Sequence, residues 1–269
     1  TGVPGAGKST FIDALGSRLV EAGRRIAVLA VDPTSHLSGG SILGDKTRMP
    51  RLASEGNAFV RPSPSMRAPG GVAPRTREVI LLCEAAGYDT VFVETVGVGQ
   101  AETAVHSMVD FFLLLALAGA GDELQGIKRG IVEMADAIAI TKADGENVQA
   151  ARRARVQYRQ ALRLFPPADS GWEARVLTCS SVSGEGVGEI WQAVTDYVTL
   201  AKGSGYFERR RKDQSRAWLD EAFEELVRSQ LRANPTLNDR RQELERLVLE
   251  GKKSPSSAAL DLTDELFRA

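Results

Sequence analysis

Cysteine and histidine are scarce in this sequence, which has two of each among 269 residues. Cys83 and Cys179 lie far apart in apolar stretches and no CxxC pair occurs, so we expect two buried free thiols in a reducing compartment. His36 and His106 are not spaced with another metal ligand, and we expect both to be solvated. This shortage of ligands argues against a metallochaperone that delivers nickel.

The sequence also lacks a long apolar run and an imbalance of charge. No apolar stretch approaches the ~18 residues of a membrane-spanning helix, and we see no signal peptide. Basic residues number 34 against 35 acidic ones, and the isoelectric point is near 6.2. We therefore expect neither nucleic acid nor a membrane as partner, and a cytoplasmic location.

A phosphate-binding loop opens the chain. TGVPGAGKST, residues 1–10, fits the spacing G-x-x-x-x-G-K-[ST] at Gly2, Gly7, Lys8 and Ser9. In this motif backbone N–H groups wrap the α- and β-phosphates, the lysine reaches the β- and γ-phosphates, and the hydroxyl ligates Mg²⁺. Apolar residues at helical spacing follow and stop at Gly23, as expected of the helix behind such a loop.

Strand and helix patterns alternate along residues 1–202. Apolar and β-branched runs predict buried strands at residues 25–32, 90–95, 111–117, 137–141 and 175–179. Helical periodicity marks residues 76–86, 125–135 and 150–164. This order predicts an α/β fold of the P-loop NTPase type, with a mostly parallel, doubly wound sheet that gathers ligands at the carboxyl ends of its strands. Because a phosphate loop follows a strand, we expect residues 1–202 to lack the first strand of the domain.

Residues 203–269 predict a helical arm after a joint at residues 203–205. Asn234-Pro235 should break its first helix, and further helices are expected at about residues 237–250 and from Ser254-Pro255. An apolar stripe on the first helix comprises Trp218, Leu219, Ala222, Phe223, Leu226 and Val227. We expect this stripe to pack on the same arm of a second subunit, or alternatively on its own domain. Residues 209–212 are expected to form a solvated charged face.

Two long loops, residues 32–49 and 61–78, are rich in Gly, Pro, Ser and Thr and are expected to be functional. Glu94 closes a predicted strand on the loop side, where it would contact Mg²⁺ or orient the attacking water. The backbone N–H of Gly97 can approach a γ-phosphate. Gln100 follows Gly97 by three residues rather than one, so unaided hydrolysis should be slow.

TKAD, residues 141–144, predicts a guanine site. Guanine presents N–H donors at N1 and N2, and a carboxylate at Asp144 can accept from both, whereas adenine offers no such pair. The stem of Lys142 would pack over the base. In the next predicted loop, Ser180 and Ser181 can present backbone to the guanine O6.

Several strings together resemble the MeaB/ArgK family of GTPases: TGVPGAGKST, AVDPTS, GGSILGDKTRM, RPSPS, GGVAPRTRE, VETVGVGQAET, GAGDELQGIKRGI, TKAD and SGEGV. The resemblance covers residues up to about 200. It implies a GTP- and GDP-binding chaperone of an adenosylcobalamin-dependent mutase of the methylmalonyl-CoA type. Family members are also described as transport-system kinases for lysine, arginine and ornithine, and a tail of this kind builds a homodimer in the family.

The resemblance implies a role for individual residues of this chain. Nucleotide-binding residues would be Gly2, Pro4, Gly5, Ala6, Gly7, Lys8, Ser9, Thr10, Gly97, Lys142, Asp144, Ser180, Ser181 and Val182. Lys8, Asp32, Asp45 and Glu94 would act in catalysis, and Mg²⁺ would be held by Ser9, Asp32, Asp45 and Glu94. Residues 117–130 would form a switch that reports nucleotide state to the mutase.

The sequence departs from the family at Thr141, where many members have asparagine, and at Ala118, where proline is frequent. The departure at Thr141 should weaken the selectivity for guanine, and the departure at Ala118 should make the switch looser. A small-molecule kinase is the rival function, although no lid with paired arginines stands out.

Overall fold

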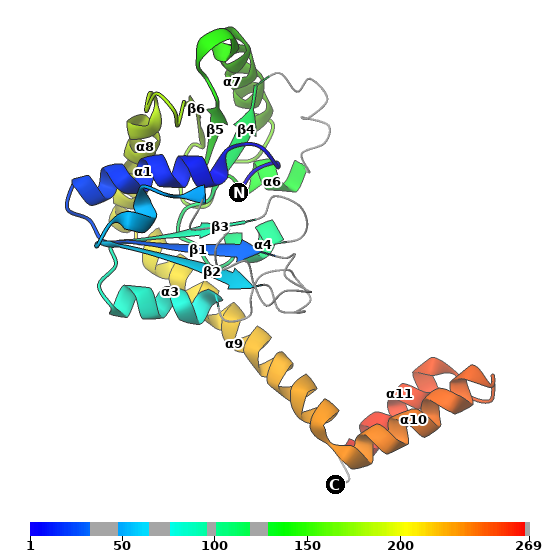
Figure 1. The fold of residues 1–269 in the computed structure, drawn as a ribbon. Coiled ribbons are helices and arrows are strands. Elements are labelled where there is room, and N and C mark those ends of the chain that lie inside the picture. The colour runs from blue at the N-terminus through cyan, green and yellow to red at the C-terminus, as the bar shows by residue number, and fades with distance from the viewer. Residues whose placement is uncertain (33–47, 65–75, 96–100, 119–128, 267–269) are drawn as a thin grey trace. The chain divides into compact units, whose positions relative to one another are not determined.

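The computed structural model describes residues 1–32, 48–64, 76–95, 101–118 and 129–266 (Figure 1). The chain divides into two compact units, Thr1–Arg210 and Arg211–Ala269. The boundary falls inside helix α9 (Tyr206–Ala233), which begins just after the Gly-Ser-Gly joint. Among the described residues, no helix is both long and apolar enough to cross a membrane.

Unit 1 contains two three-stranded parallel sheets. The first has the order β2-β1-β3, formed by Ala58–Pro64, Ile26–Asp32 and Thr90–Glu94. The second has the order β4-β5-β6, formed by Leu113–Leu117, Ala137–Thr141 and Arg175–Thr178. Gly2 forms a parallel bridge with Leu115 of β4, and the Thr95 hydroxyl, just past β3, donates to the Thr1 hydroxyl at 2.8 Å. Residues 1–2 therefore contact both sheets.

Helices cover both faces of these sheets. Helix α1 (Lys8–Glu21) lies across both of them, and α8 (Val187–Gly203) packs beside it in one core cluster (Figure 1). The opposite face of the first sheet packs on α3 (Thr76–Ala85). The corresponding face of the second sheet packs on α4 (Ala101–His106), α6 (Arg129–Glu133) and α7 (Val148–Leu162). Short 3-10 turns, η1 (Leu52–Ser54) and η2 (Gly145–Asn147), complete the unit.

Alternation within β1 explains this double coverage. Ile26 and Val28 belong to the core cluster of α1, whereas Ala27 and Leu29 belong to the cluster of α3. All four are fully buried. The continuous apolar run that predicted this strand is thus a strand buried on both faces, and the predicted doubly wound α/β fold is confirmed.

Strand β2 was not predicted, because residues 61–64 were assigned to a loop on account of their prolines. Within the part of the chain that the structure describes, the strand lies at the edge of its sheet and pairs with β1 alone. Pro62 and Pro64 are two residues apart, so both backbone nitrogens point the same way, and an edge strand tolerates prolines whose nitrogens point away from the sheet. The loop assignment for residues 61–64 was therefore wrong.

Unit 2 contains the rest of α9 and a helical hairpin. Asn234 caps α10 (Pro235–Leu249), since its side-chain oxygen accepts from the Leu237 N–H at 3.3 Å. Helix α11 (Pro255–Leu266) follows, and the Ser254 hydroxyl accepts from the Ser257 N–H at 3.2 Å. These helix boundaries confirm the predicted breaks.

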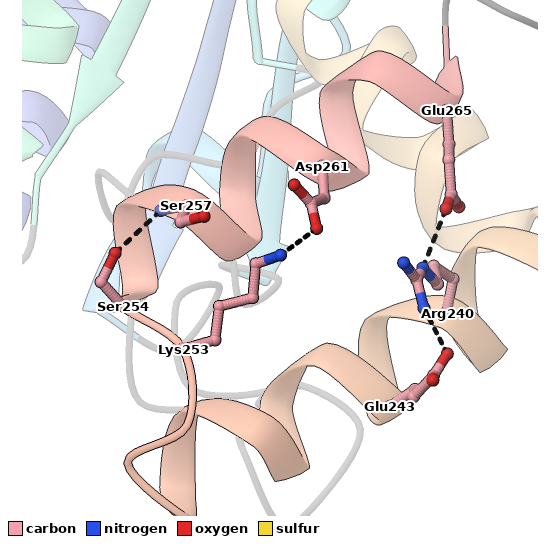
Figure 2. A network of polar contacts seen from close by, with 7 residues as sticks. All are labelled: Arg240, Glu243, Lys253, Ser254, Ser257, Asp261 and Glu265. Carbon is pink, nitrogen blue, oxygen red and sulfur yellow. Dashed lines mark hydrogen bonds and ion pairs between the residues drawn. The ribbon is translucent and has the colours of Figure 1, made fainter.

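Ion pairs join the two helices of the hairpin. Arg240 of α10 pairs with Glu265 of α11 at 2.8 Å and with Glu243 on its own helix, and Lys253, which precedes α11, pairs with Asp261 (Figure 2). Leu244 and Ala258 are buried in this hairpin.

The charged run at residues 209–212 is not simply solvated. Arg210 donates to the Tyr197 hydroxyl at 3.2 Å and lies 3.4 Å from the His106 ring nitrogen. His106 packs edge-on against Phe112, with 5.4 Å between ring centroids. Burial, and then the charge of Arg210, lowers the pKa of His106 to about 4. The predictions of a solvated His106 and a solvated Arg210 were therefore wrong, because helices distant in sequence enclose both side chains.

Candidate functional site

The phosphate loop passes through left-handed backbone twice before α1 begins. Gly5 and Gly7 have φ angles of 82° and 79°, a region that glycine adopts without steric cost. Gly7 is the N-cap residue of α1, and no side chain caps the helix there. Since the first N–H groups of a helix need an acceptor, this end of α1 is suited to bind a phosphate.

Lys8 closes the same loop. Its Nζ donates to the carbonyl oxygens of Gly2 at 2.8 Å and Val3 at 3.2 Å. Burial lowers the pKa of Lys8, while the negative charges of Glu94 and Glu102 raise it. The ammonium group is therefore held in the loop by oxygen acceptors that phosphate oxygens can replace.

Ser9 and Glu94 meet at the carboxyl end of the first sheet. The Ser9 hydroxyl donates to Glu94 Oε1 at 2.7 Å, although 85 residues separate them in sequence. Asp32 ends the neighbouring strand β1, two residues beyond Ala30, which pairs with Glu94. The structure thus brings two predicted oxygen ligands together and puts the backbone of a third at the same edge.

This donor set suits a hard divalent cation. Mg²⁺ prefers oxygen ligands and is usually held by one or two carboxylates together with phosphate oxygens and water. The contact between the Ser9 hydroxyl and the Glu94 carboxylate supplies two side-chain oxygens and so fits that requirement.

The predicted base site forms where β5 and β6 end. Ser180 donates its hydroxyl to the Asp144 carboxylate, across 36 residues of sequence. Lys142 has φ 54°, the single non-glycine residue with positive φ among those described. The Ala143 N–H donates to the Cys179 carbonyl at 3.0 Å, which ties the two loops together.

The backbone of the Ser180 loop is arranged around a tight turn. The Ser180 N–H donates to the Glu185 carbonyl at 2.9 Å, so this donor is already satisfied within the loop. Ser181 is half-buried and Val182 is 86% exposed. Ser180 therefore contacts Asp144 through its hydroxyl, while its backbone N–H is bonded within the loop.

Thr141 joins the base site to the phosphate loop. Its hydroxyl is buried and lies 2.8 Å from the Ala6 carbonyl and 3.2 Å from the Ala116 carbonyl. No local pattern indicates this contact, because it depends on the pairing of β5 with β4 beside the loop. The Thr141 hydroxyl thus contacts the phosphate loop, at the position where many members of the resembled family have asparagine.

The remaining predicted site residues differ in exposure, and some lie outside the described residues. In the phosphate loop Ala6 is buried, while Pro4 and Thr10 are exposed. Asp45 and Gly97 lie outside the described residues, as do residues 119–128 of the predicted switch and the side chain of Asp32.

Sequence reasoning missed a further acidic residue, Glu102. It lies in the first turn of α4, is 5% exposed, and its charge acts on Lys8. It lies within the string VETVGVGQAET, but no residue spacing assigned it a role.

The chain is similar to known proteins in sequence and in fold. A family model described as "Methylmalonyl Co-A mutase-associated GTPase MeaB" matches residues 1–236. A probable GTPase of Mycobacterium tuberculosis H37Rv is 50% identical over 264 residues, which are 98% of this chain and 79% of that protein. GTPase ArgK of Escherichia coli K12 is 52% identical over 234 residues, which are 87% of this chain and 71% of ArgK.

A solved structure of a LAO/AO transport system kinase superposes with a TM-score of 0.75 at 41% identity, covering 99% of this chain and 80% of that one. Since the family match spans most of the chain and these relatives are themselves named GTPases, the chain belongs to the MeaB family of GTP-hydrolysing P-loop proteins.

Proposed function

We propose that the protein hydrolyses GTP to control an adenosylcobalamin-dependent acyl-CoA mutase of the methylmalonyl-CoA type, as a chaperone that protects or loads that enzyme. The observation that carries the proposal is the match of residues 1–236 to a family whose description names this mutase. The geometry at the strand ends supports the nucleotide half of the proposal.

The phosphate loop and Lys8 would bind the triphosphate. Backbone N–H groups of residues 5–10 surround the phosphates, and the Lys8 ammonium exchanges its loop carbonyl acceptors for β- and γ-phosphate oxygens. Both interactions favour the charge that develops as the γ-phosphate leaves.

Ser9, Asp32, Asp45 and Glu94 would hold Mg²⁺ and the attacking water. The Ser9–Glu94 hydrogen bond already brings two of them into contact. When bound, Mg²⁺ would supply positive charge that offsets the negative charge of the phosphates. Glu94 would accept a hydrogen bond from a water molecule on the metal or from the attacking water and so orient that water toward the γ-phosphate.

Asp144 would select guanine through the N1 and N2 donors of the base, with Lys142 over its face. Because Ser180 donates to Asp144, the carboxylate is held in place before the base arrives. The Thr141 link keeps the base site and the phosphate loop at a fixed separation.

Hydrolysis without the partner should be slow, because no glutamine directly follows Gly97. We propose that the mutase binds residues 117–130 and thereby fixes the groups around the γ-phosphate. The glycines of this segment permit wide backbone change. Nucleotide state and mutase affinity are then coupled in both directions.

GTP turnover with and without an adenosylcobalamin mutase tests this proposal. We expect stimulation of the wild-type protein and reduced stimulation of Asp122→Ala and Lys128→Ala, with Arg159→Ala of α7 as a surface control. A mutase that binds without changing turnover contradicts the proposal. Equal stimulation of all variants moves the contact to residues 32–49.

A small-molecule kinase is the second candidate, because the similar solved structure carries the name of a transport system kinase. The two functions differ in product. A GTPase releases inorganic phosphate, whereas a kinase transfers the phosphate to a small molecule or a protein. Release of inorganic phosphate without any added acceptor favours the GTPase.

A cytoplasmic location and assembly into a homodimer through the arm are further parts of the proposal. The dimer is supported by the exposed apolar stripe of α9, of which Leu219, Phe223 and Leu226 are each more than 60% exposed.

A further inference from the structure

Helix α4 is held at its carboxyl-terminal end by two arginines from distant parts of unit 1. Arg210 of α9 lies 3.4 Å from the ring nitrogen Nε2 of His106, the last residue of α4. Arg77 of α3 donates to the hydroxyl of Ser107, the next residue along the chain, at 2.7 Å. Both contacts fix the same end of this helix.

The surroundings of His106 favour a ring nitrogen that accepts a hydrogen bond. A guanidinium group can only donate, so His106 Nε2 is the acceptor in its contact with Arg210. Burial, and then the charge of Arg210, lowers the pKa of His106 to about 4, so the ring is neutral at pH 7. Its edge-on packing against Phe112 fixes the orientation of the ring.

The rest of α4 lies against the phosphate loop. Val105 of α4 belongs to the buried core cluster against which Val3 of the loop packs, and the Val3 carbonyl accepts from Lys8 Nζ at 3.2 Å. Glu102, in the first turn of α4, is 5% exposed, and its negative charge raises the pKa of Lys8. A displacement of α4 would therefore change both the packing of the loop and the charge beside Lys8.

The two contacts of Arg210 serve different purposes. Its Nη1 donates to the Tyr197 hydroxyl at 3.2 Å, which ties α9 to α8, the helix that directly precedes it. Its Nη2 instead reaches His106, 104 residues earlier in the sequence. Holding the start of α9 in place requires only the first contact, whereas the second connects α9 with the helix beside the phosphate loop.

We propose that Arg210 is a positioning residue for GTP hydrolysis, because it holds α4 at His106 and so keeps that helix in place against the phosphate loop. Arg210, the last residue of unit 1, touches neither nucleotide nor metal. The first turns of α9 are then part of the GTPase unit rather than only the start of the arm. The inference rests on the nucleotide half of the proposed function, and not on the mutase or on a dimer.

The test measures kcat and KM for GTP in the full chain, with the number of sites fixed by titration with a fluorescent GDP analogue. Arg210→Met keeps a long side chain without its donors, and His106→Phe keeps a ring against Phe112 without the acceptor. Each variant should lower kcat about tenfold and change KM by less than about threefold, because misplaced groups slow the reaction more than they weaken binding. The double variant should be no slower than Arg210→Met, since both changes remove the same contact.

Two further variants separate positioning from anchoring. Tyr197→Phe removes the other acceptor of Arg210 but leaves the contact with His106, so it should lower the melting temperature and leave kcat at the wild-type value. Arg209→Met is the matched control, because Arg209 is an exposed arginine beside Arg210 on the same helix. Amide hydrogen exchange with GDP bound gives a second measurement, in which α4 should exchange faster in Arg210→Met than in the wild-type protein.

The outcomes are distinct. If Arg210→Met and His106→Phe lower the melting temperature but keep the wild-type kcat per nucleotide site, both residues are structural only and the inference is overturned. If Tyr197→Phe slows hydrolysis as much as Arg210→Met while His106→Phe does not, Arg210 acts through α8, which also overturns it. A wild-type protein that does not hydrolyse GTP contradicts the proposed function together with the inference. A lower kcat in both variants, with no further loss in the double variant, supports the link.

Discussion

The two units of the chain bury apolar surface to very different extents. Among the described residues, every buried hydrophobic side chain lies in unit 1 except Leu244 and Ala258. Unit 2 instead shows surface ion pairs and a helix, α9, on which no residue is buried. Unit 1 thus forms a core of its own, whereas the apolar stripe of α9 is largely exposed.

The largest expected effect is on assembly through the arm. The double variant Phe223→Asp with Leu226→Asp places charges in the exposed stripe and should convert a dimer into a monomer, because desolvating unpaired charges in an interface is costly. Sedimentation equilibrium measures the mass, and Glu224→Ala on the same helix is the control. A monomeric wild-type protein would contradict this prediction, because the arm would then not join two subunits.

Within unit 1, Glu94→Gln tests the site without disturbing the core. Glutamine keeps the shape of the side chain and an oxygen for Ser9, but loses the charge, so GTP hydrolysis should fall about 100-fold while GTP affinity stays nearly unchanged. Single-turnover hydrolysis and fluorescence titration measure the two quantities. Unchanged hydrolysis would assign the role to another residue, with Asp45 the next candidate.

Asp136 and His106, two groups of unit 1 whose pKa values respond to the charge of Arg210, lead to a prediction about the pH dependence of stability. Burial raises the pKa of Asp136 from 3.8 to about 6, although the Phe112 N–H donates to its carboxylate at 2.8 Å. The free energy of unfolding therefore contains a part that falls as pH rises from about 4 to about 6. The lowered pKa of His106, from 6.5 to about 4, contributes a part that rises over a similar range.

These two parts oppose each other, so the wild-type stability should change little between these pH values. Asp136→Asn should expose the rise due to His106, and His106→Gln the fall due to Asp136, each with a slope of up to about 1.4 kcal/mol per pH unit. Urea unfolding at pH 4.5, 5.5 and 6.5 measures these slopes. Equal slopes in both variants would show that Asp136 and His106 do not set the pH dependence of stability in this range.

The smallest effect is expected in the ion pairs of unit 2. Lys253→Ala removes the contact with Asp261 and should lower the free energy of unfolding by less than about 1 kcal/mol, since such pairs are screened by solvent and salt. Urea unfolding at low and high salt measures it, with Arg241→Ala, an exposed residue of α10, as the control. A larger loss would mean that charge pairing, not apolar contact, stabilises the hairpin.

Local patterns in the sequence were sufficient for most of the fold. The phosphate loop, α1 and five strands follow from runs of neighbouring residues, as do the helix breaks at Asn234 and Ser254. Strand β2 was missed because proline in a short segment of sequence favours a loop. An edge strand tolerates proline, but the edge position of β2 follows only from the order of strands in the sheet.

The site was predictable as a set of residues but not as a set of contacts. Residue types and spacing indicated Ser9, Glu94 and Asp144 separately. Three hydrogen bonds join residues far apart in sequence: from Ser9 to Glu94, from Thr141 to Ala6, and from the Leu52 N–H to Asp13. Such pairs form only after parallel strands have brought their carboxyl ends together, so no local pattern reveals them.

Calorimetric titration of the intact protein with GDP and with ADP tests the central claim most directly, namely that unit 1 holds a site built for guanine. The account predicts that GDP binds much more tightly than ADP, and that Asp144→Asn lowers the GDP affinity by about 10- to 100-fold, equivalent to about 1–3 kcal/mol for an unmatched donor. Equal affinities for the two nucleotides in the wild-type protein would contradict it.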